Sequence, residues 1–347
     1  MKRMTAPDSF KAIAAFMVIF IHVTAAPVTT LTSGCSYNLL LLVNRFSKPS
    51  VPMFLFVSGL VLQRSYQNRA FRYGEFLQRR VQKVLIPYVI WCAIYYAWFI
   101  FHGIYEFDSG FFAENLLSGK MMYHLYFVVV IVQYYVLFAF FRWITEKYPA
   151  HFVLPAAALL NLIEICIISE QYYGRCFITY LTVFFMGCYI AKHYEKAMEM
   201  LLKLKSILFL AAGFFGFGIL YTLQFAREMS WERGIFDDDR IVFLLFSLFA
   251  SLLIYSLCVL LAKKADGGCS FSGRLEYVLC SIGKASFYIY LAHPFLMLIA
   301  QEAALALGET GVVREMLLML ALIFFICIPG ALVYANLKEH RHTIKER

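Results

Sequence analysis

Residues 10–23 read FKAIAAFMVIFIHV, an apolar run with Lys11 at its start and His22 near its end. Such a run predicts a membrane-spanning helix. A charge at the edge of a spanning helix is common, whereas an imidazole inside it costs free energy unless a neighbour satisfies its polar atoms. His22 is therefore the first candidate functional residue.

The rest of the chain has the same character as this first stretch. Hydrophobic residues make up 62% of the 347 residues and charged residues 15%, against about 45–50% and about 25% in soluble proteins. We predict an all-α polytopic membrane protein, a single integral-membrane domain over residues 1–347, in which the first helix is not a cleaved signal peptide. Of the predicted spanning helices, those at 50–66 and 152–168 have the weakest hydrophobic pattern. Ten apolar stretches, most of them long enough to cross about 30 Å of hydrocarbon, lie at 10–28, 50–66, 84–102, 123–141, 152–168, 176–191, 206–224, 241–262, 285–304 and 315–335.

The positions of Lys and Arg predict the orientation of the chain in the cell membrane. With the N-terminus inside, the cytoplasmic segments hold 23 of the 31 basic residues and the outer loops hold 8, as the positive-inside rule requires. Both termini are then cytoplasmic, and residues 338–347 form a charged cytoplasmic tail. The asymmetry also accounts for the net charge of +9, so the charge indicates a partner bilayer and no nucleic acid.

The cysteines and histidines predict no metal site. None of the nine cysteines form a CxxC pair, and most lie inside predicted helices, where small packing residues are expected. The nearest His and Glu cluster, EHRHTIKER at 339–347, belongs to the charged tail.

Lys11 and His22 are predicted to share one face of the first helix. Eleven residues make three turns plus about 20°, and they separate the two side chains by about 16 Å along the axis. One face then carries a cation at the cytoplasmic edge and a titratable base toward the outside. The alternative is that Lys11 only extends to the membrane surface and that His22 bonds to a neighbouring helix.

Further stretches carry polar residues in or beside predicted helices. The stretch at 63–88 reads QRSYQNRAFRYGEFLQRRVQKVLIPY, and its Arg79, Arg80 and Lys83 fall on one helical turn. Such a cluster is suited to binding phosphates. Membrane topology and contact with lipid headgroups also explain it. Ser58–Gly59 permits a close approach of two helices. His124 in YHLYFVV and His293 in FYIYLAHPF are histidines in apolar surroundings. A packing role explains each of these features singly.

In this order the motifs resemble the bacterial acyltransferase-3 family over residues 8–300. FKAIAAFMVIFIHV resembles the first-helix signature of a basic residue, ten residues and a histidine. Five further stretches are also similar to motifs of the family: SVPMFLFVSGLVL, LQRRVQKVLIPY, YHLYFV, FFMGCYIAK and GKASFYIYLAHPF. The resemblance implies a multipass enzyme that moves an acyl group, usually acetyl, from cytosolic acyl-CoA to a hydroxyl or amine of a cell-surface glycan or glycolipid precursor.

Two departures from the family pattern qualify the resemblance. The first-helix cation is Lys11 instead of the usual Arg, which keeps the charge and loses the bidentate fork. HLYFVVVIVQYY at 124–135 lacks the paired glutamates that some branches carry in a mid-chain helix. The chain therefore resembles the short branch without an appended soluble domain.

The chemistry of acyl transfer gives each candidate residue an expected role. His22 is the general base, because neutral imidazole takes a proton near neutral pH. Lys11, Arg79, Arg80 and Lys83 meet the phosphates of acetyl-CoA, and no metal is expected. His124, Tyr126, Ser58 and His293 are assigned to the substrate, and His293 is equally interpretable as a packing residue. We favour direct transfer over an acyl-enzyme, since no nucleophile lies in a recognisable activating frame.

Other functions remain open on the sequence alone. A transporter or flippase for a lipid-linked sugar or other envelope precursor would also need many helices and intramembrane polar residues, although no helix pair is visibly interrupted in corresponding halves. A structural or sensor protein would leave His22, His124 and His293 unexplained. Within the enzyme reading, an O-acetyltransferase is the first expectation, and the acceptor can be a sugar, peptidoglycan, an amino acid or a lipid headgroup.

Overall fold

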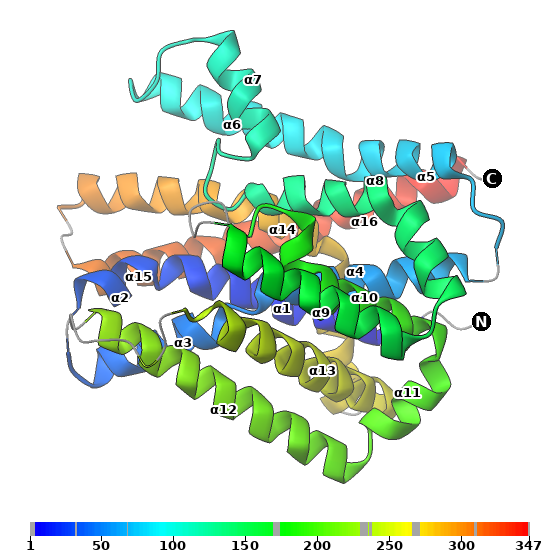
Figure 1. The fold of residues 1–347 in the computed structure, drawn as a ribbon. Coiled ribbons are helices and arrows are strands. Elements are labelled where there is room, and N and C mark those ends of the chain that lie inside the picture. Colours follow the sequence, from blue (N-terminus) through cyan, green and yellow to red (C-terminus); the bar gives the residue numbers. More distant parts are fainter. Residues whose placement is uncertain are drawn as a thin grey trace. The chain divides into compact units, whose positions relative to one another are not determined.

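The computed structural model describes residues 4–31, 33–67, 69–168, 174–229, 235, 238–265, 271–308 and 311–345, without the side chains of 341–345. The described residues form helices and turns and contain no strand, which confirms the all-α prediction (Figure 1). The chain divides into two compact units. Unit 1 comprises Met1–Val57 and Glu195–Arg347, and unit 2 comprises Ser58–Tyr194.

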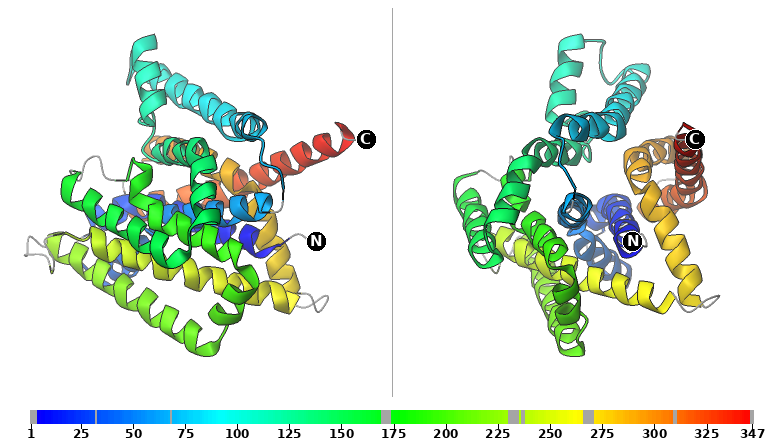
Figure 2. Two further views of the ribbon diagram at one scale, coloured as in Figure 1. Left: turned by 45° about the vertical axis from the view of Figure 1, so that its right-hand side comes forward. Right: turned by 90° about the vertical axis from the view of Figure 1, so that its right-hand side faces the viewer.

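Unit 1 is built around the N-terminal helix α1. Its apolar sequence packs on α14 and also contacts α3, α13 and α15, and Figure 2 shows α1 lying among these helices. The start of α1 and the end of α16 lie at the same end of unit 1 in Figure 1. The helices of unit 1 are α1 (Ala6–Val23), α2 (Ala25–Thr30), α3 (Cys35–Ser47), the first half of α4 (Ser50–Tyr66), α11 (Tyr194–Leu201), α12 (Leu204–Met229), α13 (Arg240–Ala265), α14 (Phe271–Ala306), α15 (Val312–Leu322) and α16 (Ile328–Lys345).

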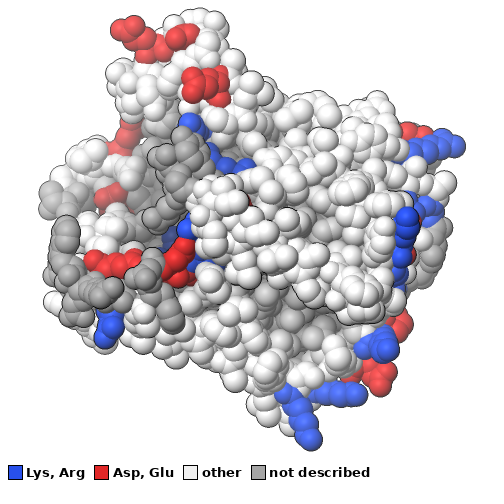
Figure 3. All heavy atoms as spheres, viewed as in Figure 1, with Lys and Arg blue, Asp and Glu red and all other residues white. Residues whose placement is uncertain are grey.

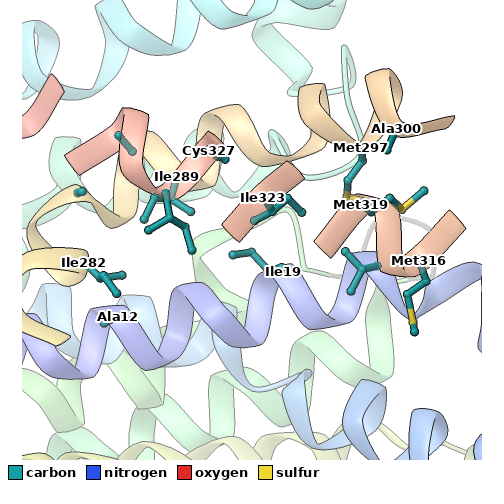
Figure 4. Close-up of a cluster of buried hydrophobic side chains, with 14 residues drawn as sticks. Ala12, Ile19, Ile282, Ile289, Met297, Ala300, Met316, Met319, Ile323 and Cys327 are labelled. Carbon is teal, nitrogen blue, oxygen red and sulfur yellow. The ribbon is translucent and has the colours of Figure 1, made fainter. Parts of the chain in front are cut away.

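The core of unit 1 lies between α1, α14 and the last helices of the chain. Ala12 of α1 lies near Ile282 of α14, and Ile19 of α1 lies near Ile323 (Figure 4). Met297, Met316 and Met319 extend the same cluster, where flexible thioether side chains fill irregular gaps between helices. Small residues on α1 and aliphatic residues on α14 thereby hold the two helices in contact along most of their shared length.

Unit 2 contains the basic stretch and the middle helices of the chain. Asn161 and Glu164 are buried polar residues of α9, and Glu164 accepts a hydrogen bond from the Thr179 hydroxyl at 2.5 Å. The predicted span at 152–168, one of the two least certain, is thus a helix long and apolar enough to cross a membrane, with the short 3₁₀ turn η3 as a partner for its polar groups. After the second half of α4, the elements are α5 (Tyr73–Arg80), the π-helical turn η1 (Val81–Leu85), α6 (Ile86–Phe101), α7 (Ser109–Ser118), α8 (Tyr126–Lys147), α9 (Ala150–Ile167), η3 (Phe177–Tyr180) and α10 (Leu181–Lys192).

Eight helical segments of the described chain are long and apolar enough to cross a membrane. The other two predicted spans, 50–66 and 176–191, are also helical, but α4 has 17 residues and Phe177–Lys192 is likewise shorter than the eight. Figure 3 shows wide uncharged surface on the face in view, with Lys and Arg gathered toward the side where Figure 1 places the termini. The predicted charged tail is helical as far as the structure describes it, because α16 continues to Lys345, and residues 346–347 lie outside the described part.

Two segments contain a π-helical turn of five residues just before an Ile–Pro pair. Val81–Leu85 precedes Ile86–Pro87, and Ile323–Cys327 (η4) precedes Ile328–Pro329. A proline in a regular helix removes one hydrogen bond and clashes with the carbonyl four residues earlier. In the wider turn, the Ile86 N–H donates to the Val81 carbonyl and the Ile328 N–H donates to the Ile323 carbonyl. This wider turn makes room for the carbonyl four residues before each proline.

Candidate functional site

His22 lies against a second histidine from a distant part of the sequence. The rings of His22 and His293 are stacked, with centroids 5.5 Å apart and planes 28° from parallel. His22 is partly exposed, whereas His293 is fully buried. The pair therefore joins a partly exposed imidazole of α1 to a fully buried one of α14.

The orientation of His293 follows from the proline beside it. Pro294 has no backbone N–H, so the Tyr290 carbonyl four residues earlier loses its helical partner. The His293 Nδ1 lies 2.9 Å from that carbonyl and 3.1 Å from the carbonyl of Ile289. Because carbonyls only accept, Nδ1 carries the hydrogen and Nε2 is left as the acceptor nitrogen. The His–Pro pair thus fixes both the ring position and its tautomer.

The turn of α1 that carries His22 is anchored by α3. The Asn44 amide donates to the Ile21 carbonyl at 3.0 Å and to the Thr24 hydroxyl at 2.9 Å. Asn44 and Thr24 are both buried. These bonds, which bracket His22 in the sequence, hold its backbone in place at the end of α1.

Lys11 is on the same continuous helix as His22, as predicted, and it already has a partner. Its ammonium group lies 2.9 Å from the carboxylate of Asp8, three residues earlier, and 28% of its side chain is exposed. Asp8 was not singled out from the sequence, although its spacing to Lys11 is that of a helical ion pair. The face therefore presents a neutralised cation in place of the bare charge expected there.

The basic residues at 79–83 are not equivalent to one another. Arg79 is half-exposed and lies 4.0 Å from Glu75, and Lys83 is exposed within the π-helical turn. The guanidinium of Arg80 lies instead over the rings of Phe76 and Tyr135, at 5.0 and 5.1 Å. Two of the three predicted phosphate ligands thus face outward, and the third packs on aromatic rings.

The remaining predicted site residues belong to unit 2, apart from His293. His124 is buried in the turn before α8 and meets the Tyr95 ring edge-on at 5.7 Å. Tyr126 begins α8, with the Arg175 guanidinium 5.7 Å from its ring. Ser58 is partly buried on α4. The neighbouring Gly59 confirms the predicted close approach, since a Cβ there would lie 2.4 Å from the Phe184 carbonyl of α10.

Two basic residues that the sequence assigns only to an outer loop, together with one carboxylate that it does not single out, form a charged group in unit 1. Arg45 and Lys48 come from the last turn of α3 and the residue that caps it, and Asp239 precedes α13. Burial and the charge of Arg45 lower the pKa of Lys48 to about 8, against the opposing influence of Asp239. Lys48 is also close enough to interact electrostatically with His22. The spacing Asn44, Arg45, Lys48 in an otherwise apolar segment was the available signal.

Within the described residues, no group of three His, Cys, Asp or Glu side chains has the arrangement of a metal site. The eight cysteines in this part of the chain are free thiols, and several are buried among apolar side chains. Cys269 lies outside the described residues. The thiols there serve as packing groups.

Comparison with known proteins finds relatives that are similar over most of this chain. The poly-beta-1,6-N-acetyl-D-glucosamine proteins of Staphylococcus aureus, named "Probable poly-beta-1,6-N-acetyl-D-glucosamine export protein", are similar to this chain. In strain NCTC 8325 / PS 47 the identity is 24% over 265 residues, which cover 71% of this chain and 68% of the relative. The Bacillus subtilis strain 168 protein "Putative membrane-bound acyltransferase YfiQ" is 23% identical over 299 residues, covering 82% of this chain and 76% of the relative. No solved structure gives a significant match.

The family comparison covers nearly the whole chain. Residues 4–335 match the acyltransferase-3 family, described as an acyltransferase domain. The match includes both units, both π-helical turns and both members of the histidine pair. Because the match extends over nearly the whole of this multipass chain, the chain belongs to the acyltransferase-3 family of membrane proteins.

Proposed function

We propose that this protein transfers an acetyl or other short acyl group from cytosolic acyl-CoA to a hydroxyl or amine of a cell-surface glycan or glycolipid precursor. Family membership supports an acyltransferase, and the names of the relatives associate the family with membranes and polysaccharide. The observation that carries the proposal is the stacked pair in which the partly exposed His22 is backed by the buried His293.

In the proposed step, His22 acts as the general base. Its imidazole takes the proton from the acceptor hydroxyl as that oxygen attacks the thioester carbonyl. The carbon–sulfur bond then breaks, and the imidazolium returns the proton to the departing thiolate of CoA. His293 positions the His22 ring through stacking, and its own place is fixed by the Ile289 and Tyr290 carbonyls.

The donor is assigned to the basic residues at the predicted cytoplasmic face. Arg79 and Lys83 are exposed and suit the phosphates of CoA. Arg80, which is stacked on aromatic rings, adds a third positive charge beside them. Lys11 contributes when a phosphate replaces Asp8 as its partner. The pantetheine arm of CoA spaces its thioester from its phosphates, as about 16 Å of α1 spaces His22 from Lys11. His124, Tyr126 and Ser58 are assigned to the acceptor.

Transfer of label from [acetyl-¹⁴C]acetyl-CoA in membranes tests this proposal. Membranes that contain the wild-type chain should place label on an envelope glycan or glycolipid. Membranes with an equal amount of the His22→Gln variant should not. Equal labelling of both would overturn the assignment of the base, and no labelling by the wild type above empty membranes would overturn the transferase.

Export of an envelope precursor is the second candidate. It is favoured by the export function in the printed name of the Staphylococcus aureus relatives. The two candidates differ in their need for the donor, since export across sealed vesicles would proceed without acyl-CoA. Movement of a lipid-linked saccharide that is independent of both acyl-CoA and His22 would favour export.

A further inference from the structure

A compact group of charges borders the histidine pair inside unit 1. The last turn of α3 carries Asn44 and Arg45, and Lys48 caps that helix. Asn44 binds the backbone of the His22 turn, and Lys48, four residues later, falls on the same face of α3. This geometry agrees with the electrostatic interaction between Lys48 and His22.

Arg45 is held firmly while part of its hydrogen-bonding capacity goes unused. Its guanidinium lies over the rings of Tyr221 and Phe225, at 3.9 and 4.3 Å, and 7% of its side chain is exposed. Its Nε has no hydrogen-bond acceptor within the described part of the chain. Asp239 lies 3.7 Å from the guanidinium, longer than a charge-assisted hydrogen bond.

Two described carboxylates lie near Arg45: Asp239, 3.7 Å from its guanidinium, and Glu228, which interacts electrostatically with Tyr221. The carboxylate of Asp238 binds Arg240 at 2.8 and 2.9 Å, so Asp239 is left to face both Arg45 and Lys48. In the described residues Lys48 makes no hydrogen bond or ion pair of its own. Burial, and to a smaller extent the charge of Arg45, lowers the pKa of Lys48 to about 8, against the opposing influence of Asp239. The Arg45 Nε, without an acceptor among the described residues, and the ammonium group of the partly exposed Lys48 suit an incoming anion.

We propose that Arg45 and Lys48 bind an anionic group, a phosphate or a carboxylate, of the acceptor and so place its nucleophile beside His22. Arg45 is preorganised by its two rings and directs its N–H fork at the anion. Lys48 contributes a mobile point charge between that anion and the histidine pair. That the anion belongs to the acceptor rests on the proposed function, whereas the presence of an anion site does not.

The site can be tested by anion binding in the absence of any acyl donor. The full chain, purified and placed in phosphatidylcholine nanodiscs, is titrated with inorganic phosphate at pH 7 while its thermal unfolding is followed. A ligand that binds only the folded state raises Tm with its concentration. The wild type should show a saturable rise. Lys48→Gln should weaken the apparent phosphate affinity by about tenfold or more, the worth of one charge-assisted contact.

Matched variants separate the site from general charge effects. Lys48→Arg should retain the phosphate response, and Lys120→Gln, which removes an exposed lysine of unit 2, should leave it unchanged. Lys48→Gln should fold, since Lys48 makes no hydrogen bond within the described residues. Arg45→Gln removes a buried stacked group and is interpretable only if its Tm without phosphate is close to that of the wild type. An equal phosphate response in wild type and Lys48→Gln, or none in the wild type, would overturn the site.

The pH dependence gives a second and independent readout. Lys48 faces Arg45 on its own helix, Asp239 before α13 and His22 on α1. Because the free protein loses the Lys48 charge as pH rises through about 8, phosphate affinity should fall between pH 7 and pH 9. Lys48→Arg should abolish that fall. A fall of equal size in both proteins would count against Lys48 as the ligand.

The source of the anion is distinguished by lipid composition. In nanodiscs with phosphatidylglycerol, the phosphate response should persist if the site takes the acceptor. If phosphatidylglycerol alone raises Tm in a Lys48-dependent manner and abolishes the response to phosphate, a lipid headgroup occupies the site and the acceptor assignment is wrong. Failure of acyl transfer with intact phosphate binding would instead contradict the proposed function alone.

Discussion

Gly283 of α14 lies directly on the backbone of Asp8 in α1, so closely that a Cβ at position 283 would come 1.8 Å from the Asp8 carbonyl oxygen. Around this contact, the Ser9 hydroxyl lies 3.3 Å from the Cys280 sulfur, and the Thr5 hydroxyl donates to Glu276. The contact sets how near the two helices lie and thereby how His22 meets His293. A small residue at such a crossing is the usual way for membrane helices to pack closely.

Gly283→Ala should therefore separate α1 from α14. The obstructing atoms are backbone, so the loss of stability should reach about 1–3 kcal/mol or more. Thermal unfolding of the purified protein in detergent measures it. Gly330→Ala on α16 is the matched control, because nothing lies within 4 Å of a Cβ there, and an equal loss in both variants would show that the Gly283 crossing has no special role.

His22→Gln should reduce kcat by roughly 10²–10⁴-fold, the usual worth of a positioned base. Glutamine can still form hydrogen bonds but does not take a proton at neutral pH. Binding of acyl-CoA, followed by isothermal titration calorimetry, should be nearly unchanged because the phosphates are bound elsewhere. Near-normal turnover in this variant would reduce His22 to a packing residue.

His293→Asn and His293→Leu test the positioning role of the second histidine. The asparagine amide can still donate to the Tyr290 carbonyl that Pro294 leaves without a helical partner, so this variant should keep the stability of the wild type. It loses the stacked ring, and kcat should fall about tenfold with the KM for acyl-CoA unchanged. The leucine variant should lose stability as well. Full activity in a folded His293→Asn protein would contradict the positioning role.

The three basic residues before α6 should respond differently to substitution. Replacing Arg79 and Lys83 together by Gln should raise the KM for acyl-CoA several-fold and leave Tm unchanged, because both side chains are exposed. Arg80→Gln should lower Tm, since it removes a guanidinium stacked on Phe76 and Tyr135. Arg72→Gln, which breaks only an exposed pair with Glu75, is the control for lost charge. An unchanged KM in the double variant would show that Arg79 and Lys83 do not bind acyl-CoA and serve only the membrane topology of the chain.

Orientation can be tested by labelling with a membrane-impermeant maleimide in whole cells. Cys35 and Cys166 are exposed thiols and are first replaced by serine. A cysteine at position 120 should then react from outside, and one at position 72 should react only after the cells are opened. This follows from the bias of 23 basic residues to 8 toward the predicted cytoplasmic segments. Labelling of position 72 in intact cells would contradict the topology.

Much of the fold could be predicted because hydrophobic length is a local property. Each of the ten apolar stretches is largely helical, although the first, 10–28, is divided at Thr24 between α1 and α2. The close approach at Gly59 was also predictable, because a small pair inside an apolar helix is a local signal. By contrast, helices α3 and α7 lie outside the ten predicted spans. Their sequences are shorter or more polar, and their helical form depends on the helices they contact, as α3 contacts α1 and α12.

The candidate site was less predictable because it depends on which helices meet. The shared face of Lys11 and His22 is a matter of helical period, but the stacking of His22 on His293 joins residues 271 positions apart. The ion pair of Lys11 with Asp8 was visible as a spacing of three residues and was overlooked. The environment of Arg80 could not be read from its turn, since Tyr135 comes from α8.

The π-helical turn at Val81–Leu85 makes the direction of the basic residues depend on a proline. A wider turn holds one residue more than an α-helical turn, so it rotates everything before it by about 100° relative to the helix that follows. Deleting Gln82 alone would restore the regular spacing and bring Pro87 against the carbonyl four residues before it. Deleting Gln82 together with Pro87→Ala would leave a straight helix. Arg79 and Arg80 would then be rotated about the helix axis relative to α6. The phase of this helix, as much as its charge, then determines which side of α6 the cations face.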